Sequence, residues 1–412
     1  MSKTTSNPPA PIGDAPRLRT VIPVLGVTQI LAWGSSYYLL AVLAQPIARD
    51  TGWPLARIVG GLSLGLLVAG IVSPRVGHSI QRLGGRLVLA TSAVFLAAGL
   101  IGLALSPNLP LYTVSWLVLG IGMGAGLYDP AFATVGRIYG RRARTAIATV
   151  TLFGGFASTI CWPLSALLVA EFGWRNACLI YAGIHLLILL PLYLFALPKE
   201  QKRGTRAVGT SGRSELVGPA VPTGLMPLFV LMALVFTVSS MISTMLSVHL
   251  LTILQPRGIA LAAAVALGAI VGPCQVGARA IEMAISRFYH PIWTKFASAA
   301  FIAIGVGLLW ANVPIVAAAL AFYGAGIGIE SIARGTLPLA VFGEHHYPAI
   351  MGRIAMSSLI MQAASPSLGA VLLTRLGVNG ALAVLFAVAV VNVLLVMVLF
   401  GVMQKRGSAK RV

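Results

Sequence analysis

The sequence predicts an all-α integral membrane protein whose helices cross a bilayer many times. Of its 412 residues, 58% are hydrophobic and only 9% are charged, whereas soluble domains average about 25% charged residues. Apolar segments of about 20 residues recur along the chain, and each is long enough to span a hydrocarbon core about 30 Å thick. The segments lack the polar alternation of barrel strands, and backbone amides cannot stay unpaired in lipid, so helices are the expected spanning elements.

The apolar segments predict twelve transmembrane helices in two pseudo-symmetric six-helix halves. The expected spans are residues 21–45, 57–78, 87–106, 110–138, 146–170, 175–197, 226–250, 260–283, 291–311, 315–341, 351–374 and 379–402. The longest polar stretch, residues 198–225, is rich in Gly, Ser and basic residues and predicts a cytoplasmic linker. It separates an N-terminal half from a C-terminal half, and short tails flank them: the halves are residues 21–197 and 226–402, and the tails are residues 1–20 and 403–412.

The first span follows two basic residues, Arg17 and Arg19, as the core of a secretory signal would. It is too long for a signal core, and eleven further spans follow it. We therefore interpret it as an uncleaved first helix.

The basic charge of the chain predicts its orientation rather than a nucleic-acid partner. The formal net charge is +20. If both termini are cytoplasmic, 22 of the 29 Lys and Arg residues, Lys295 among them, fall in cytoplasmic tails and loops, and five fall in outer loops. This asymmetry is the positive-inside pattern of a protein of the cell inner (plasma) membrane. Anionic lipid is the expected partner of the cytoplasmic surface, and no nucleic acid is expected.

A glycine cluster followed by an acid occurs in corresponding helices of the two halves. The fourth span contains GAGLYDPAFATVGR, residues 124–137, and the tenth contains GAGIGIESIARG, residues 324–335. The shared rank in each half favours a duplicated six-helix unit, although three small residues also match easily by chance. The glycines predict closely packed helices. A dinucleotide-binding loop is disfavoured because no strand precedes them.

The loop between the second and third predicted helices carries a glycine- and arginine-rich motif. It reads GHSIQRLGGR and supplies Gly77, Arg82, Gly84 and Arg86. With twelve helices, two halves and a basic linker, the chain from about residue 20 to 402 resembles the major facilitator superfamily of secondary transporters. The resemblance implies that family's fold and a cytoplasmic latch at this loop. Gln81 stands where the family usually has an acid, which puts an N-terminal latch in doubt.

Two further segments bear on the resemblance. Residues 137–158 and 173–183 are similar to the branch that contains monocarboxylate and oxalate carriers. In the loop after the eighth helix, Glu282 stands close to the position of the missing acid. We expect Glu282 to act as the latch, against a cluster of basic residues formed by Arg141, Arg142 and Arg144. The alternative is an ion pair between Glu282 and Arg279 at i, i+3.

Charged residues inside the spans are the main candidates for function. Asp129, Glu330 and Arg334 lie well inside their helices, and Arg279 lies near the end of the eighth. Each would cost at least about 2.5 kcal/mol facing lipid, so they are expected to face a cavity or charged partners. We expect Asp129 and Glu330 to couple transport to protons. Arg334 and Arg279 could clamp a carboxylate through two hydrogen bonds each.

Local pairing is the alternative for these charges. Glu330 and Arg334 stand at i, i+4 and could neutralise one another. Asp129 has no basic residue within one turn, its nearest downstream one being Arg137. Desolvation would then favour the protonated carboxyl, so Asp129 is expected to be the better proton carrier of the two acids.

The first helix carries a stripe suited to a cavity wall. In TQILAWGSSYYLL, the side chains of Gln29, Trp33, Ser36 and Tyr37 fall on one face. Polar and aromatic groups together suit a small organic molecule, so Gln29, Trp33 and Tyr37 are candidate substrate contacts. An outer aromatic belt is an equal alternative for Tyr37 and Tyr38.

These patterns predict a secondary active transporter that moves a small organic anion by proton-coupled alternating access. Efflux of a drug or a trivalent arsenical is the alternative, because Cys161 and Cys274 could supply soft thiolate ligands, although packing as small apolar residues is the simpler role. An enzyme is disfavoured because no long loop and no nucleophile, zinc or phosphate-cradling motif occurs. A channel is a third option. We expect a monomer without cofactor or metal, and the direction of transport stays open.

Overall fold

The computed structural model describes residues 18–199 and 223–409, and the described residues are overwhelmingly helical, with no strand among them. Most of the predicted linker and both tails lie outside these ranges. The division into residues 21–197 and 226–402 therefore stays a prediction.

The first part of the chain folds into helices that break at defined points. The helices are α1 (Leu18–Gly34), α2 (Leu40–Thr51), α3 (Leu55–Leu83), α4 (Gly85–Ala104), α5 (Leu109–Gly126), α6 (Tyr128–Tyr139), the 3-10 turn η1 (Gly140–Arg142), α7 (Ala143–Gly155), α8 (Ala157–Ile184) and the π-helical turns η2 (His185–Leu189) and η3 (Leu192–Ala196). The pairs α1–α2 and α5–α6 each form one interrupted span. Gly173 divides α8, because its φ of 78° suits a residue without a Cβ.

The second part of the chain contains one very long helical stretch. The elements are η4 (Thr223–Leu225), α9 (Met226–Leu254), η5 (Gln255–Arg257), α10 (Leu261–Ala269), α11 (Val271–Ile285), η6 (Ser286–Phe288), α12 (Pro291–Trp310) and α13 (Val316–Ala409). Left-handed glycines at Gly343 and Gly377 divide α13 into three spans, and α10 and α11 together form one. With α7 and the part of α8 before Gly173 counted as one span, and the rest of α8 with η2 and η3 as another, the described helices make the twelve predicted spans.

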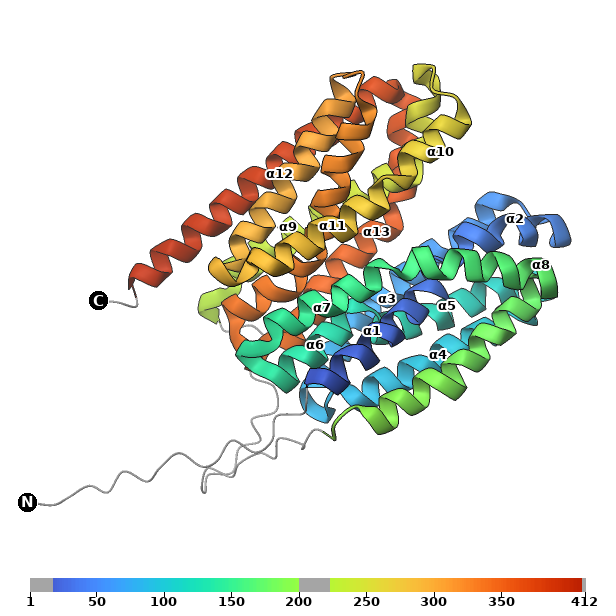
Figure 1. The fold of residues 1–412 in the computed structure, drawn as a ribbon, viewed down its shortest axis with the longest axis horizontal. Helices are drawn as coiled ribbons and strands as arrows, with labels where there is room; N and C mark the ends of the chain where they lie inside the picture. The colour runs from blue at the N-terminus through green and yellow to red at the C-terminus, as the bar shows by residue number, and fades with distance from the viewer. Residues whose placement is uncertain (1–17, 200–222, 410–412) are drawn as a thin grey trace, which may run out of the picture.

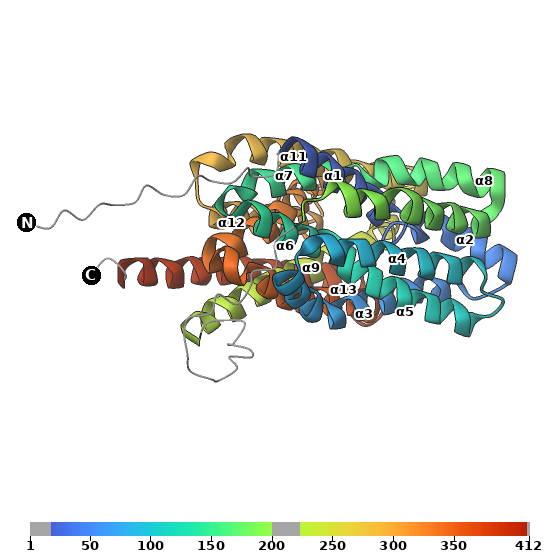
Figure 2. The same cartoon turned by 90° about the horizontal axis from the view of Figure 1, so that it is seen from below.

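The helices form two groups that meet along one side (Figure 1). The N-terminal group is α1–α8 with η2 and η3, and the C-terminal group is α9–α13. In Figure 1 the groups lie close together toward the end that carries the C-terminus, and they diverge toward the end that carries α2 and α10. Figure 2, turned by 90°, shows the helices of both groups running along the same long axis. The architecture is the all-α helical bundle that the sequence predicts.

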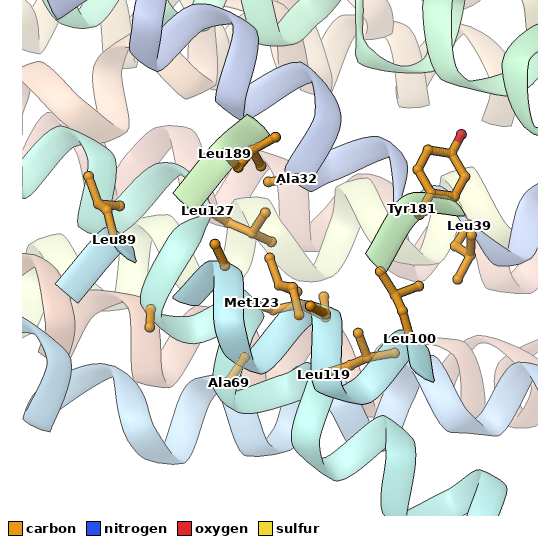
Figure 3. Packing of buried hydrophobic residues seen from close by; sticks show 14 of the residues in the cluster. Ala32, Leu39, Ala69, Leu89, Leu100, Leu119, Met123, Leu127, Tyr181 and Leu189 are labelled. Atoms are coloured by element: carbon orange, nitrogen blue, oxygen red, sulfur yellow. The ribbon is translucent and has the colours of Figure 1, made fainter. Parts of the chain in front are cut away.

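Glycines bring helices into backbone contact inside each group. A Cβ added to Gly120 of α5 would lie 2.5 Å from the carbonyl oxygen of Gly65 on α3, and one added to Gly328 of α13 would lie 2.5 Å from that of Gln275 on α11. Fully buried Ala69, Leu119 and Met123 pack beside the first of these contacts (Figure 3). The packing role predicted for the glycine clusters is confirmed.

The two groups also approach closely through glycine. A Cβ on Gly77 of α3 would collide with the carbonyl oxygen of Pro348 on α13, and one on Gly352 would collide with that of Ser73. Nearby, the fully buried ring of Tyr347 of α13 packs against Gly136 of α6, where an added Cβ would collide with the ring. These contacts close the interface at the end of α3 that leads into the loop at Gly84.

Candidate functional site

The fourth span breaks where its glycine cluster ends. Helix α5 stops at Gly126, Leu127 is extended with φ −80° and ψ −159°, and α6 begins at Tyr128. Asp129 lies in the first turn of α6, where the helix dipole stabilises a negative charge. The side-chain amide of Gln29 donates a 2.7 Å hydrogen bond to the carbonyl of Gly126, whose partner in a continuous helix would be Pro130, a residue without an N–H. The break thus places a carboxylate at a helix start inside the membrane.

A salt bridge between the two groups of helices holds Asp129. Nε of Arg334 on α13 donates to Oδ1 of Asp129 at 2.8 Å, and Nη2 donates to Oδ2 at 3.1 Å. The side chains are 14% and 12% exposed for Asp129 and Arg334 respectively, so the pair is largely withdrawn from solvent without being sealed. Along its own helix, Asp129 has no basic residue within one turn. The structure supplies a basic neighbour from the other group.

Glu330 pairs with a lysine rather than with Arg334. Nζ of Lys295 on α12 lies 2.6 Å from Oε1 of Glu330 and 2.7 Å from Oε2. The hydroxyl of Ser298 adds a bond of 2.5 Å to Oε2. Within the described residues no salt bridge joins Glu330 to Arg334, so the local i, i+4 pair is wrong. Glu330 and Arg334 lie one turn apart on α13, each bound to a different partner.

The charge pattern predicts a cytoplasmic loop position for Lys295, and this prediction is wrong. The side chain of Lys295 is completely buried in the first turns of α12. The expected ninth span, residues 291–311, already contained it. A lysine inside an apolar span was therefore the available signal, since such residues are expensive unless paired.

Arg279 lies at the interface but binds neutral groups. Its Nε donates to the carbonyl of Gly328 at 3.0 Å, Nη1 to that of Thr151 in the N-terminal group at 3.1 Å, and Nη2 to Oε1 of Gln275 at 3.4 Å. Gly155 of α7 leaves room for the guanidinium, because a Cβ there would collide with Nη1. No salt bridge to Glu282 occurs among the described residues, so that local pair is also wrong.

The three candidates from the first helix join an aromatic cluster. The cluster consists of Trp33, Tyr37, Tyr38, Tyr128 and Phe132. The ring of Trp33 lies 4.9 Å from that of Tyr128 and 5.2 Å from that of Tyr37, and Tyr128 stacks on Phe132 at 5.1 Å, measured between centroids. Nε1 of Trp33 donates to Oε1 of Gln29 at 3.2 Å. Gln29 therefore supports the helix break and Trp33, while Trp33 and Tyr37 form part of an aromatic surface next to Asp129.

Two residues of the predicted latch segment, Gly77 and Gln81, contact α13 of the opposite group. Gly77 packs on Pro348, as described above. Gln81, which replaces the family's acid, donates from its amide to the carbonyl of His345 at 3.0 Å. Arg82 is exposed and Arg86 is half-buried. The last turn of α3 thus reaches α13 through an amide rather than a carboxylate.

Glu282 connects to the basic cluster through an intermediate residue. It is buried and accepts hydrogen bonds from the hydroxyls of Tyr289 and Thr294, the latter at 2.6 Å. Burial raises the pKa of Tyr289, and the hydrogen bond to Glu282 raises it further, so its hydroxyl stays protonated and donates. Nη1 of Arg144 donates to the Tyr289 carbonyl at 2.6 Å. The side chain of Arg141 lies outside the described ones.

The cysteines lie in separate surroundings. Cys161 is buried against Gly34 of α1, and Cys274 lies against Gly324 of α13, so each packs within its own group. Across the described residues, no cluster of three or more His, Cys, Asp or Glu side chains could hold a metal ion.

The family of the chain follows from comparison with known proteins. The sequence profile of the Major Facilitator Superfamily matches residues 25–287, which is more than half of the chain. The chain belongs to the Major Facilitator Superfamily. Members of this family are transporters, so the predictions of a multi-pass membrane transporter, rather than an enzyme, are confirmed.

Several curated proteins match part of the chain. Human monocarboxylate transporter 11 is 31% identical over 172 residues, which are 39% of this chain and 34% of the relative. The 4-hydroxybenzoate transporter PcaK of Acinetobacter baylyi is 26% identical over 202 residues, 46% of this chain and 42% of the relative. An uncharacterised 38 kDa protein of Thermoproteus tenax is 32% identical over 167 residues, 40% of this chain and 43% of the relative. The matches span less than half of each relative.

Solved structures share the fold over nearly the whole chain. The human organic anion transporter MFSD10 (TETRAN) superposes with a TM-score of 0.73 at 16% identity, covering 92% of this chain and all of that one. The proton:xylose symporter XylE superposes with a TM-score of 0.69 at 13% identity, covering 92% and 94%. These likenesses confirm the predicted twelve-helix fold.

Proposed function

We propose that this protein is a secondary active transporter that carries a small organic monocarboxylate together with a proton by alternating access. The observation that carries the proposal is the two-point hydrogen bonding of the Asp129 carboxylate by the Arg334 guanidinium between the two groups of helices. A guanidinium held ready for one carboxylate in this geometry fits a substrate carboxylate equally well. In this proposal the Asp129 carboxylate occupies the position on Arg334 that the substrate carboxylate takes.

Exchange of these two carboxylates on Arg334 couples the substrate to a proton. Ionised Asp129 competes with the substrate, because both need the same two donors. When Asp129 takes up a proton it loses its charge and its hold on Arg334, and the substrate carboxylate replaces it. A proton therefore enters with each monoanion. Arg279 places a second guanidinium at the interface, with neutral acceptors only among its described bonds, and strengthens the attraction for an anion.

The aromatic cluster supports a substrate with an organic body beside its carboxylate. Trp33, Tyr37 and Tyr128 are only partly buried, and Tyr128 directly precedes Asp129 in the chain. Aromatic rings suit a planar or apolar substituent of a substrate. The partial matches to proteins named as carriers of monocarboxylates and of 4-hydroxybenzoate agree with this class.

Alternating access follows from the contacts between the two groups. The Asp129–Arg334 bond and the contact of Gly77 with Pro348 both join the groups on the side of the loop at Gly84. If that loop is cytoplasmic, as the charge pattern predicts, the described state is closed toward the cytoplasm. Breaking these contacts opens the route on that same side.

Reconstituted vesicles test the proposal. Labelled benzoate, 4-hydroxybenzoate and lactate are offered under an imposed pH gradient and, separately, in counterflow at equal pH. We expect Asp129→Asn to abolish gradient-driven accumulation while sparing counterflow. We expect Glu330→Gln alone to impair both, because it leaves the buried ammonium of Lys295 without its carboxylate partner. Asp50→Asn, which removes a carboxylate near the outer end of α2, is the matched control and keeps both. Accumulation that survives in Asp129→Asn contradicts the coupling role, and transport of none of the three acids contradicts the substrate class.

A further inference from the structure

A second ion pair lies one helical turn from Arg334 and has no role in the exchange described above. It joins Lys295 of α12 to Glu330 of α13, and its lysine is 0% exposed. The ammonium of Lys295 has three hydrogen-bond partners: Oε1 and Oε2 of Glu330, and the hydroxyl of Ser239 at 2.7 Å. It also lies 4.9 Å from the centre of the Phe236 ring. All three donors of the buried charge are therefore used.

Burying this ion pair is costly, so stability alone does not explain its presence. Removing two charges from water costs several kcal/mol per ion, and well-packed apolar residues often replace a buried pair at no loss. The surrounding polar groups show how closely it is held. Ser298 donates to Glu330, and Asn392 donates to the same Ser239 hydroxyl at 2.8 Å.

The position of Glu330 makes it a competitor for Arg334. Residues at i and i+4 of a helix lie on one face, where opposite charges attract. An unpaired Glu330 would find Arg334 as the nearest cation on its own helix, and Arg334 would turn along α13 instead of across the interface. In the structure Lys295 occupies both oxygens of Glu330, and Arg334 points to Asp129.

Consecutive serines of α9 separate the two pairs. The hydroxyl of Ser239 accepts from Lys295, and that of Ser240 accepts from Nη1 of Arg334 at 3.4 Å. Each cation thus has its own carboxylate and its own hydroxyl. The ammonium of Lys295 and the guanidinium of Arg334 also repel one another, which keeps Arg334 away from the carboxylate that Lys295 binds.

We propose that Lys295 is a positioning residue that engages Glu330 and thereby keeps the Arg334 guanidinium available to the interface, where it binds Asp129 or a substrate carboxylate. This inference rests on the proposed role of Arg334 in substrate binding. Its structural part, the choice of Arg334 between Asp129 and Glu330, does not depend on any substrate.

A double-mutant cycle without substrate tests the structural part. Melting temperatures of the full chain, purified in detergent, are measured for Asp129→Asn, Arg334→Gln and their combination, first with Lys295 present and then with Lys295→Met. We expect the coupling between Asp129 and Arg334 to fall by at least about half in Lys295→Met. Adding Glu330→Gln to Lys295→Met removes the competitor, and the coupling returns. Unchanged coupling in Lys295→Met overturns the proposal.

The variant Lys295→Met/Glu330→Gln keeps the test decisive if Lys295→Met alone does not fold, because it leaves no unpaired buried charge. A coupling close to that of the wild-type chain in this double variant supports the positioning role, and a lost coupling contradicts it. Lys295→Arg, which keeps the charge, serves as the conservative control and should keep the coupling.

Transport kinetics add the functional part. With labelled benzoate in counterflow, we expect Lys295→Met to raise the apparent KM about tenfold, and Lys295→Met/Glu330→Gln to return it to within about threefold of the wild-type value. A KM that stays high in the double variant, with the melting cycle restored, contradicts the link to substrate binding. If neither the wild-type chain nor any variant transports benzoate, the result contradicts the proposed function. The positioning role of Lys295 is still tested by the melting cycle, which needs no substrate.

Discussion

Arg334 donates two nearly parallel hydrogen bonds to the two carboxylate oxygens of Asp129, a residue 205 positions earlier in the chain. The bond joins the first turn of α6 to the middle of the first span of α13. Both side chains keep partial exposure, 14% for Asp129 and 12% for Arg334, so the bond is largely buried without being sealed from solvent. It is the described ion pair that connects the two groups of helices.

The geometry of this pair predicts a strong difference between arginine and lysine at position 334. Lysine keeps the charge but presents a single nitrogen, so it cannot make two parallel bonds to one carboxylate. We expect Arg334→Lys to raise the apparent KM for benzoate about tenfold, which corresponds to about 1.4 kcal/mol. Counterflow in vesicles measures it. Arg375→Lys, at an exposed arginine, is the control, and equal KM values for the two variants would exclude the clamp.

The glycine contact between α3 and α13 predicts that added volume blocks closure. A Cβ on Gly77 collides with a backbone carbonyl, which cannot rotate away as a side chain can. We expect Gly77→Ala to shift the chain toward the state open on that side and to slow counterflow at least about tenfold. Gly60→Ala is the matched control on the same helix, because nothing lies within 4 Å of its added Cβ.

Accessibility of single cysteines reports the same shift. In Gly77→Ala, a probe cysteine at Ser73, which is buried at this contact, should react faster with a water-soluble maleimide than in the Gly60→Ala background. Equal reaction rates would show that closure does not depend on the contact of Gly77 with Pro348.

The charge distribution predicts the orientation of the chain. In a background without the three native cysteines, we expect cysteines replacing Arg82 and Arg287 to label only from the cytoplasm, and those replacing Asn108 and Asn312 to label from outside. All four positions are exposed, so labelling reads the side of the membrane rather than burial. Outside labelling at Arg82 would reverse the orientation.

A cluster at the end of α2 predicts an acid-dependent contribution to stability. Nε1 of Trp174 donates to Oδ2 of Asp50 at 3.0 Å, and Nη1 of Arg175 donates to the same oxygen. The bond from Trp174, the bond from Arg175 and the positive charge of Arg175 lower the pKa of Asp50. Because the folded value lies below the unfolded one of about 3.9, the contribution is present above that pH and is lost as the pH falls through the folded value.

We therefore expect Asp50→Asn to lower the melting temperature at pH 7 by no more than about 2 °C, since the pair is exposed. The difference should shrink below about pH 4, where the wild-type carboxyl also becomes neutral. Glu171→Gln, at an exposed carboxylate of α8, is the control. A difference that stays constant from pH 7 to pH 3 would show that the ionised form of Asp50 does not matter.

The spans and the acids were predictable because they are local properties of the sequence. Runs of apolar residues report the spans, and a carboxylate inside such a run stands out. Pairing was not predictable in the same way. Helical spacing offers only neighbours within one or two turns, so Glu330 was matched with Arg334, whereas tertiary packing brings Asp129 to Arg334 and Lys295 to Glu330.

Lys295 shows a second limit. It stands five residues into the expected ninth span, and a charge so near a boundary suits a loop as well as a helix when boundaries are uncertain by two to four residues. The break at Leu127 was equally hidden, because glycines predict close packing and flexible backbone alike. Only the partner of the freed carbonyl, Gln29, shows that the break is held in one place.

The two ion pairs at the centre of the molecule have an electrical consequence. Each joins one anion to one cation, so neither contributes net charge to the part of the chain that rearranges. In the proposed transport of a monoanion with one proton this balance stays intact, and the complete cycle is then electroneutral. Membrane voltage then neither drives nor opposes the flux, and the concentration ratio that the carrier can sustain is set by the pH difference alone.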